Sequence, residues 1–184
     1  MSDGVLRKLG LRKNWIYETI VTTHSRSSIN SAPVGIWTKD LKSLNLKLYK
    51  RSTTFKNIIK NGFFVINFPS NLGAFYDALS SKKLKYIKTR GGGYALPRLS
   101  FLEMMVKSTK SMGDAVEFKA YITRYRIKEN TRFFNRAQYL TLEYLIKKTK
   151  PKPNKKELAE YRSVVNKVAP KSIYIRMVNT IKLK

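Results

Sequence analysis

Residues 51–67 read RSTTFKNIIKNGFFVIN and contain the signals of a helix followed directly by a strand. Ser52, Thr53 or Thr54 can cap the helix, because a hydroxyl at this position accepts a hydrogen bond from a backbone N–H of the first turn. Apolar residues follow at helical spacing, and the Asn-Gly pair at 61–62 supplies the left-handed conformation in which many helices end. The stretch therefore predicts a capped helix with a defined stop.

The segments around this helix have the residue patterns of strands. The continuous apolar run FFVINF after it has strand length, which predicts a strand buried on both faces. β-Branched composition or alternation of apolar and polar residues predicts four more strands: IYETIVTT (16–23), SAPVGIWT (31–38), the segment around Leu44, Leu46 and Leu48, and AVEFKAYITRYRI (115–127). The first two are separated by the polar turn HSRSSIN, which indicates a hairpin.

The remaining segments are predicted from periodicity and caps. A short helix is expected over residues 71–80, an exposed connection over 81–98, and a strand over 172–183. Residues 135–148 show apolar positions on two opposite sides of a helix, which predicts packing on both sides. A further helix begins after the linker TKPKPN, where Asn154 stands three residues before Glu157 as in a capping box.

The chain carries an extreme positive charge. It has 38 Lys and Arg against 11 Asp and Glu, a formal net charge of +27 over 184 residues. Such a field attracts polyanions and phosphorylated small molecules, so nucleic-acid binding is one candidate function. The basic residues are spread along the chain, however, and no zinc-finger spacing or RNP signature accompanies them. A solvated, lysine-rich surface is the alternative explanation.

The residues that the chain lacks exclude several classes of protein. It contains no Cys, so a disulfide framework, a thiolate metal site and a cysteine nucleophile are excluded. The N-terminal residues lack the apolar core of a signal peptide, and no uninterrupted apolar run is long enough to span a bilayer. We therefore expect a cytoplasmic protein without a membrane segment.

Side chains suited to acid–base catalysis or metal binding are scarce. His24 is the single histidine and lies in the polar turn, where a solvated imidazole is expected. Glu18 and Glu143 lie in otherwise apolar segments, where a buried ion pair with a lysine explains them. The glycine run 91–93 lacks the GK[ST] sequence of a phosphate loop and predicts a flexible connection. The sequence therefore indicates no catalytic and no metal-binding residue.

The start of the predicted helix is the best candidate for a ligand site. Its hydroxyls and free backbone N–H groups, with Lys50 and Arg51 beside them, suit a dianionic phosphate. The alternative is an ordinary helix cap with two spare threonines.

The series of segments resembles the flavin reductase-like, FMN-binding split-barrel proteins, and more closely the mainly archaeal DUF447 family, whose members combine that barrel with a helical C-terminal part. The matching stretches are YETIVTT (17–23), NSAPVGI (30–36), RSTTFKNI (51–58), GFFVINF (62–68) and NRAQYLTLEYLIKKTK (135–150). The resemblance implies a mainly β, α+β fold, with a split-barrel flavin-binding domain over residues 1–130. Residues 131–184 would form a helical section packed on the barrel.

The resemblance also implies a set of cofactor contacts. The FMN phosphate would be held by hydroxyls of the first strand and the helix start, with one cation beside them: Thr22, Thr23, Ser52, Thr53, Thr54 and Arg51. The flavin ring would lie along the second strand, lined by Asn30, Ala32, Pro33, Val34 and Gly35, while Asn57 would brace the helix. The Ser-rich turn HSRSSIN stands where relatives often carry an Asp-Gly type turn, which is expected to alter the rim of the pocket.

The expected function follows from this resemblance. It implies an FMN-dependent oxidoreductase of the flavin reductase type, a homodimer with the flavin near the subunit interface, and NAD(P)H as a possible electron donor. Since a flavin brings its own redox chemistry, the protein need only bind, orient and tune it, and the scarcity of catalytic side chains is no objection. The alternatives are a basic nucleic-acid-binding protein and a non-catalytic flavin-binding or assembly module.

Overall fold

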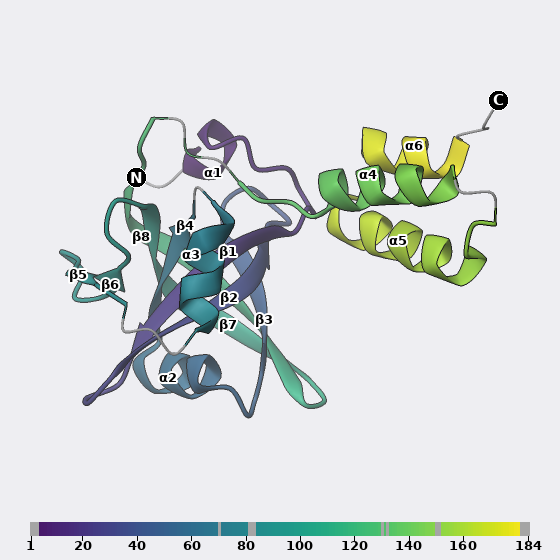
Figure 1. Cartoon of the computed structure of the whole chain (residues 1–184). Coiled ribbons are helices and arrows are strands. Elements are labelled where there is room, and N and C mark those ends of the chain that lie inside the picture. The colour runs from purple at the N-terminus through teal and green to yellow at the C-terminus, as the bar shows by residue number, and fades with distance from the viewer. Residues whose placement is uncertain are drawn as a thin grey trace. The chain divides into compact units, whose positions relative to one another are not determined.

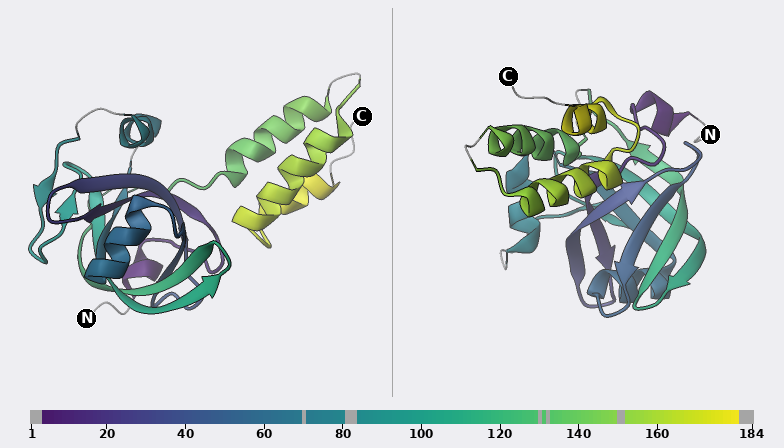
Figure 2. Two further views of the ribbon diagram at one scale, coloured as in Figure 1. Left: turned by 90° about the horizontal axis from the view of Figure 1, so that it is seen from below. Right: turned by 90° about the vertical axis from the view of Figure 1, so that its right-hand side faces the viewer.

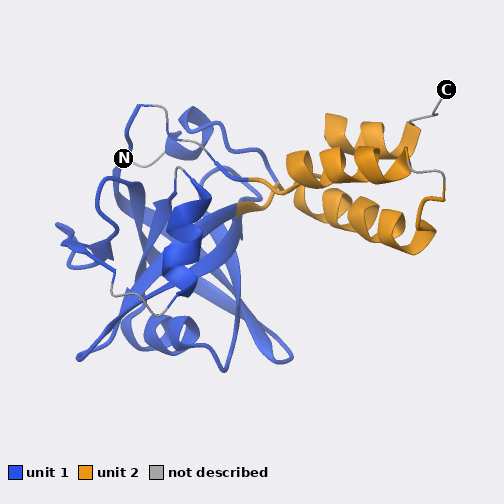
Figure 3. Ribbon diagram, in the orientation of Figure 1, with its two compact units in different colours: residues 1–13, 18–134 blue, residues 14–17, 135–184 orange. Residues whose placement is uncertain are grey.

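The computed structural model describes residues 4–69, 71–80, 84–129, 131, 133–149 and 152–180. The chain forms two compact units, drawn in two colours in Figure 3. The barrel unit comprises residues 1–13 and 18–134, and the helical unit comprises residues 14–17 and 135–184. The predicted domain boundary at residue 130, and the packing of the helical section on the barrel, stay predictions.

A closed six-stranded antiparallel barrel forms the centre of the first unit, with strand order β1-β2-β3-β8-β7-β4 (Figure 1). The strands are β1 (Tyr17–His24), β2 (Ile29–Trp37), β3 (Leu44–Tyr49), β4 (Phe63–Phe68), β7 (Ser100–Met112) and β8 (Ala115–Arg126). The ring that they make is visible in the left-hand view of Figure 2. The predicted α+β class, with a barrel and C-terminal helices, is confirmed.

Alternation of buried and exposed residues places the barrel core. Leu44, Leu46 and Leu48 of β3 are buried and pair with alternate buried residues of β8, among them Phe118. β4 pairs with both β1 and β7 and is buried from Phe64 onward, as its continuous apolar pattern predicts. The interior is therefore filled by side chains from every second position.

Helix α2 (Thr53–Asn61) lies across one end of the barrel (Figure 1). Its Phe55 ring meets the ring of Phe118 edge-on at 5.9 Å, and Ile58 is almost completely buried. Ser52 is the N-cap, and Gly62 ends the helix with φ 65°. The predicted cap and stop are therefore both confirmed. Two shorter helices complete this unit: α1 (Val5–Lys8) and α3 (Leu72–Leu79).

The segment predicted as an exposed connection instead covers part of the barrel. It forms a small hairpin of β5 (Ile87–Lys88) and β6 (Tyr94–Ala95), and Ala95 is buried against Val65 and Phe101. Gly93 lies so close to β4 that a Cβ there would be 2.5 Å from the Phe63 ring. The prediction was wrong because the charged residues of the hairpin obscured its few buried positions. Residues 81–83 lie outside the described residues.

Strand β7 is the longest strand and has no counterpart among the predicted elements. The first five residues of the strand (100–104) are buried, whereas its last six residues (107–112) are exposed. Neither half alternates, and register shifts against β8 occur at Glu103/Met104 and Val106/Ser108. A strand covered on both faces at one end and on neither at the other lacks the period-two signal that sequence patterns depend on.

The helical unit consists of α4 (Ala137–Lys148), α5 (Lys155–Val168) and α6 (Ile173–Thr180). Its core is formed by Tyr144, Val165 and Val178 with their neighbours. Asn154 caps α5 as predicted, because its side chain accepts hydrogen bonds from two backbone N–H groups of the first turn. The second apolar side of α4 is about half exposed in the single chain: Tyr139 58%, Leu142 55% and Ile146 50%.

The strand predicted over residues 172–183 is wrong, because residues 173–180 form α6. The β-branched residues of this segment favoured a strand, but Tyr174, Ile175 and Val178 recur at helical spacing and pack into the core of the unit. The Ser172 hydroxyl accepts a hydrogen bond from the N–H of Ile175 and caps the helix. Residues 181–183 lie outside the described residues.

A short N-terminal segment also belongs to the helical unit. The rings of Trp15 and Tyr174 lie 6.2 Å apart, and the N–H of Ile16 donates to the carbonyl of Val168 at 2.9 Å. Asn135 donates from Nδ2 to the carbonyls of Ile16 and Val168, both at 2.8 Å. The unit is thus assembled from residues more than a hundred positions apart in the chain. Among the described residues, no helix is both long enough and apolar enough to cross a membrane.

Candidate functional site

A cavity of about 590 Å³ lies in the barrel unit. It is lined by the turn between β1 and β2, the C-terminal end of α3 and the β5–β6 hairpin region: residues 25–31, Ala78, Ser80, Leu84, Tyr86 and Tyr94. The Ser-rich turn HSRSSIN therefore contributes to the rim of this cavity, whereas its expected effect on a flavin pocket stays a prediction. The volume lies in the range of small-molecule and cofactor sites.

Serine hydroxyls organise the rim of this cavity. Ser25 Oγ accepts hydrogen bonds from the backbone N–H groups of Ser27 at 3.3 Å and Ser28 at 3.1 Å. It also lies 2.9 Å from Ser28 Oγ. Arg26 at the tip of the turn is exposed and is the one charged residue among the described residues that line the cavity. The rim is thus a compact polar turn that carries a positive charge.

His24 joins this turn to the hairpin. Its ring meets the Tyr94 ring edge-on at 5.4 Å and is partly buried. The prediction that His24 is a solvated surface residue is therefore wrong, because the β5–β6 hairpin covers the end of β1. No cluster of three or more His, Asp or Glu that could hold a metal ion occurs among the described residues.

The N-terminus of α2 offers unpaired hydrogen-bond donors. Ser52 Oγ accepts from the N–H of Phe55 at 3.2 Å and donates to the carbonyl of Tyr49 at 2.8 Å. In the described part of the chain, the N–H groups of Thr53 and Thr54 have no acceptor within hydrogen-bond distance. Arg51 and Thr53 are exposed, and Thr54 is buried. Free N–H groups at a helix start attract an anion.

Three asparagines hold this helix against the first two strands. Asn30 Nδ2 donates to Thr54 Oγ1 at 3.0 Å, and Asn57 Nδ2 donates to Thr23 Oγ1 at 3.1 Å. Asn61 Nδ2 donates to the carbonyl of His24. Because Asn30 also lines the cavity, its bond to Thr54 connects the cavity with the start of α2. The predicted bracing role of Asn57 is consistent with its bond to Thr23.

A fourth asparagine was missed by the sequence reasoning. Asn67 of β4 is fully buried and donates from Nδ2 to the hydroxyl of Thr22 at 2.9 Å and to the carbonyl of Ile20 at 3.0 Å. Its Oδ1 accepts from the N–H of Leu96 at 2.8 Å, and Thr22 Oγ1 lies 2.9 Å from Ser31 Oγ. The signal was present in the sequence, because a buried amide within the apolar run FFVINF requires partners.

Most of the predicted site residues of β2 do not line the cavity. Ala32, Pro33 and Gly35 are partly buried, and Val34 is buried with its carbonyl accepting from Thr19 Oγ1 at 2.8 Å. Of the predicted residues of this strand, only Asn30 lines the cavity. The structure therefore brings together β1, the start of β2 and the start of α2, and leaves residues 32–35 outside the cavity wall.

The glycine run packs against the barrel. Gly91 donates its N–H to Oε1 of Glu103 at 3.1 Å, and a Cβ on Gly91 would clash with the other carboxylate oxygen. Glu103 is 1% exposed, with Arg124 Nη1 3.9 Å from its Oε2. Glu143, predicted as a buried ion-pair member, is exposed. The buried carboxylate of the barrel is Glu103, which lies in the strand that the sequence patterns did not reveal.

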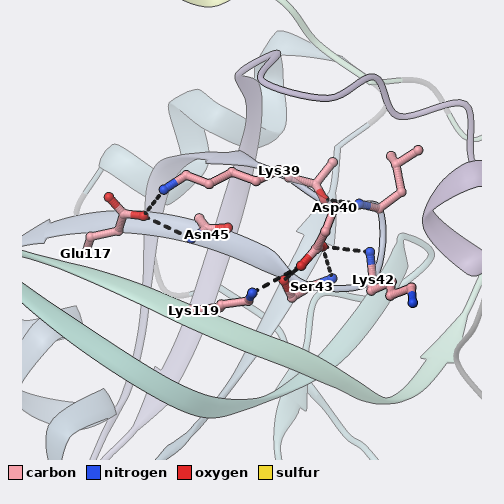
Figure 4. Close-up of polar contacts among 9 residues, drawn as sticks. Lys39, Asp40, Lys42, Ser43, Asn45, Glu117 and Lys119 are labelled. Atoms are coloured by element: carbon pink, nitrogen blue, oxygen red, sulfur yellow. Dashed lines mark hydrogen bonds and ion pairs between the residues drawn. The ribbon is translucent and has the colours of Figure 1, made fainter.

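Three further ionic contacts are formed by residues that do not line the cavity. Although partial burial raises the pKa of Asp40, hydrogen bonds from the N–H groups of Lys42 and Ser43 and from Lys119 lower it well below its usual range (Figure 4). Glu117 accepts from Lys39 at 2.9 Å and from Asn45 at 3.0 Å, as Figure 4 also shows. In the helical unit, the hydrogen bond to Glu157 raises the pKa of Lys147.

The comparison with known families gives one match. The family described as "Protein of unknown function (DUF447) N-terminal domain" matches residues 17–129. This range includes all the barrel strands and excludes the three helices of the helical unit.

Three similar solved structures extend this comparison. An FMN-bound DUF447 protein from Methanosarcina mazei is 17% identical, with a TM-score of 0.59 over 94% of this chain and 97% of that one. Flavoredoxin from Methanosarcina acetivorans is 17% identical, with a TM-score of 0.54 over 62% and 69%. An FMN-binding protein from Thermus thermophilus with bound p-hydroxybenzaldehyde is 14% identical, with a TM-score of 0.54 over 62% and 73%. The shared feature is the fold.

Proposed function

The chain belongs to the DUF447 family, and on that premise we propose that it binds FMN and acts as a flavin-dependent oxidoreductase. The observation that carries the proposal is the hydrogen bond from Asn30 to Thr54, which links a cofactor-sized cavity to a helix start with unpaired N–H groups. The FMN-bound and FMN-binding proteins among the similar structures support this function over the nucleic-acid alternative.

The residues present fit the two ends of FMN. The phosphate is a dianion, and the start of α2 offers the N–H groups of Thr53 and Thr54, nearby hydroxyls and the cation of Arg51. The flavin ring is flat and aromatic, and the cavity provides Tyr86 and Tyr94 together with polar groups of the Ser-rich turn. We assign the phosphate to the helix start and the ring to the cavity.

The other predicted contact residues have positioning roles in this proposal. The hydroxyls of Thr22 and Thr23 are buried and already bonded to Asn67 and Asn57, so they hold strand and helix in place beside the phosphate. Residues 32–35 of β2 continue from Asn30 outside the cavity wall, and they hold Asn30 in place as part of the strand.

When bound, FMN supplies the redox chemistry by accepting and donating electrons at its ring. The chain's own task is to bind and orient the cofactor and to shield it from water. Asn30 orients the helix start relative to the cavity, and the partly buried His24–Tyr94 pair closes the wall next to it. Arg26 at the rim offers a cation to an anionic reductant such as NAD(P)H.

Because the chain contains no Cys, we assign it to the reducing cytoplasm.

We assign the exposed side of α4 to a homodimer contact. Tyr139, Leu142 and Ile146 lie on one helix face, and each is at least half exposed in the single chain. A second copy of the chain would remove these apolar side chains from water. Sedimentation equilibrium measures the oligomeric state of the wild type and of Leu142→Glu. We expect a dimer for the wild type and a monomer for the variant. A monomeric wild type would overturn the assignment.

The first measurement is the absorption spectrum of the purified protein, followed by titration of the flavin-free protein with FMN. We expect saturable binding of one FMN per chain. Thr53→Ala with Thr54→Ala removes two hydroxyls from the phosphate site and is expected to raise the Kd about a hundredfold, since each hydrogen bond to a charged group contributes about 1.5 kcal/mol or more.

Thr109→Ala is the matched control, because Thr109 is an exposed threonine of the same barrel, outside the cavity and the helix start. It is expected to bind FMN like the wild type. Unchanged affinity in the Thr53/Thr54 variant would overturn the phosphate assignment. A folded wild type that binds no FMN would overturn the proposed function.

A further inference from the structure

A second cavity lies in the helical unit, in the groove between α5 and α6, with a volume of about 310 Å³. The residues on α5 are Ala159, Arg162, Ser163 and Asn166, and those on α6 are Ile175 and Asn179. The α5 residues recur at intervals of three and four, so that they share one face of the helix. Every residue that lines this groove belongs to one compact unit.

Among the described residues that line the groove, Arg162 is the one charged residue, and its side chain is held in place by Tyr144. Its Nη2 donates to the hydroxyl of Tyr144 at 2.9 Å, and the guanidinium carbon lies 5.7 Å from the centre of the Tyr144 ring. Tyr144 is 1% exposed and belongs to the core of the unit. A guanidinium that is anchored through one nitrogen loses less freedom when its remaining N–H groups bind a ligand.

The other polar groups of the groove are available to a ligand. In the described part of the chain, the side chains of Ser163, Asn166 and Asn179 have no hydrogen bond to another residue, and Arg162 has no ion pair. The carboxylate of Glu157, also on α5, is bonded to Lys147 of α4. The groove therefore combines an uncompensated cation with two amides and a hydroxyl.

From this arrangement we infer that the groove between α5 and α6 binds a small molecule that carries a carboxylate or phosphate group. The guanidinium of Arg162 binds the oxyanion with two parallel hydrogen bonds, for which its planar fork is suited. Asn166, Asn179 and Ser163 bind the remaining polar groups, and Ile175 and Ala159 contact the carbon skeleton. The site is separate from the proposed flavin site and does not depend on it.

The general positive charge of the chain must be separated from this specific site. Residues 135–184 contain thirteen Lys and Arg against three Glu, so any anion is attracted to the unit. Non-specific attraction depends on charge and on ionic strength, whereas a bidentate contact depends on the shape of the guanidinium. Exchange of Arg for Lys preserves the charge and removes the fork, and thus separates the two effects.

The test is a titration of the full-length protein with inorganic phosphate and, separately, with succinate, at constant ionic strength. The side-chain NH₂ resonances of Asn166 and Asn179 are followed by ¹H–¹⁵N NMR, which reports on the groove itself and not on the start of α2. We expect saturable shifts of both amides with at least one probe. Arg162→Lys is expected to raise the Kd about tenfold, and Tyr144→Phe to raise it severalfold, because it removes the anchor of Arg162.

Arg176→Lys is the matched control, because Arg176 is an exposed arginine of α6 that does not line the groove. It is expected to leave the Kd unchanged. Equal weakening by Arg162→Lys and Arg176→Lys, or no saturable shift in the wild type with either probe, would overturn the inference. Shifts that occur only with a short oligonucleotide would overturn it too, since they would indicate a phosphodiester surface in place of a small-molecule site.

Discussion

In the barrel unit, buried amides join the elements in addition to the apolar core, whereas in the helical unit Asn135, which joins Ile16 to Val168, is only partly buried. Asn57 and Asn67 of the barrel lie in the interior and bond to threonines of β1. The core of the helical unit contains Tyr144, Val165 and Val178, and its capping Asn154 is exposed. A buried amide demands defined partners, so the barrel is specified by hydrogen-bond geometry and the helical unit mainly by shape and volume.

This difference has a functional meaning. The barrel must hold the start of α2 and the turn after β1 in fixed positions, because the proposed site draws on both. Directional bonds fix such positions better than non-directional apolar contacts do. In the helical unit, the proposed anion site has one directional bond beneath it, from Arg162 to Tyr144. Substitutions in the two units should therefore differ in size and in kind.

The largest effect is expected from emptying the barrel core. Phe118→Ala removes a fully buried ring that packs against Phe55 of α2, and it is expected to lower the free energy of unfolding by about 4 kcal/mol. Val165→Ala removes less buried volume from the helical unit and is expected to cost about 2 kcal/mol. Urea titration followed by circular dichroism measures both. Equal losses of unfolding free energy in the two variants would contradict the expectation that Phe118 fills more buried volume than Val165 does.

A smaller effect is expected from removing one asparagine in each unit. Asn67→Ala removes the hydrogen bonds to three buried partners on two segments, with an expected loss of about 3 kcal/mol. Asn154→Ala removes an exposed helix cap and is expected to cost about 1 kcal/mol. The same urea titration measures the loss of unfolding free energy in both variants. An Asn67→Ala loss no larger than that of Asn154→Ala would contradict the view that buried amides specify the barrel.

The smallest effect concerns the surface of the barrel at acid pH. Since the pKa of Asp40 is lowered on folding, its stabilisation is fully present above the pKa of the unfolded chain, near 4, and is lost as the pH falls below that value. The side chain of Asp40 is 35% exposed, so the contribution is discounted to less than about 1 kcal/mol. Thermal unfolding from pH 6 to pH 2 measures the loss.

Asp40→Asn should flatten part of that pH dependence, whereas the exposed Asp114→Asn should leave it unchanged. Identical pH profiles for the wild type and Asp40→Asn would show that the ion pair with Lys119 contributes nothing measurable to stability.

Elements with local signals were predicted well. The cap at Ser52, the stop at Gly62 and the cap at Asn154 each depend on a few neighbouring residues, and all three are confirmed. β7 and α6 were missed or mistaken, because their burial depends on what covers them. β7 is covered by the β5–β6 hairpin along part of its length, and α6 packs its β-branched residues against α4 and α5.

The candidate site was predicted only in part for the same reason. The sequence patterns marked the hydroxyls of α2 and Asn30, which lie in segments with recognisable starts. They did not mark Tyr86 and Tyr94, which reach the cavity from a segment that showed no pattern of burial. Asn67 carried a signal, an amide in an apolar strand, but its partners Thr22 and Leu96 lie far away in the chain.

By itself, the sequence determined the alternation of strands and helices wherever burial repeats with a regular period, together with the helix ends and the scarcity of side chains suited to acid–base catalysis. Only the tertiary structure decided which polar groups meet: Asn30 with Thr54, Gly91 with Glu103, and Arg162 with Tyr144. The physical reason is that helix caps and periodic patterns arise from residues a few positions apart. A cavity or a buried hydrogen bond instead arises from segments that the chain brings together only when it closes the barrel or packs its helices.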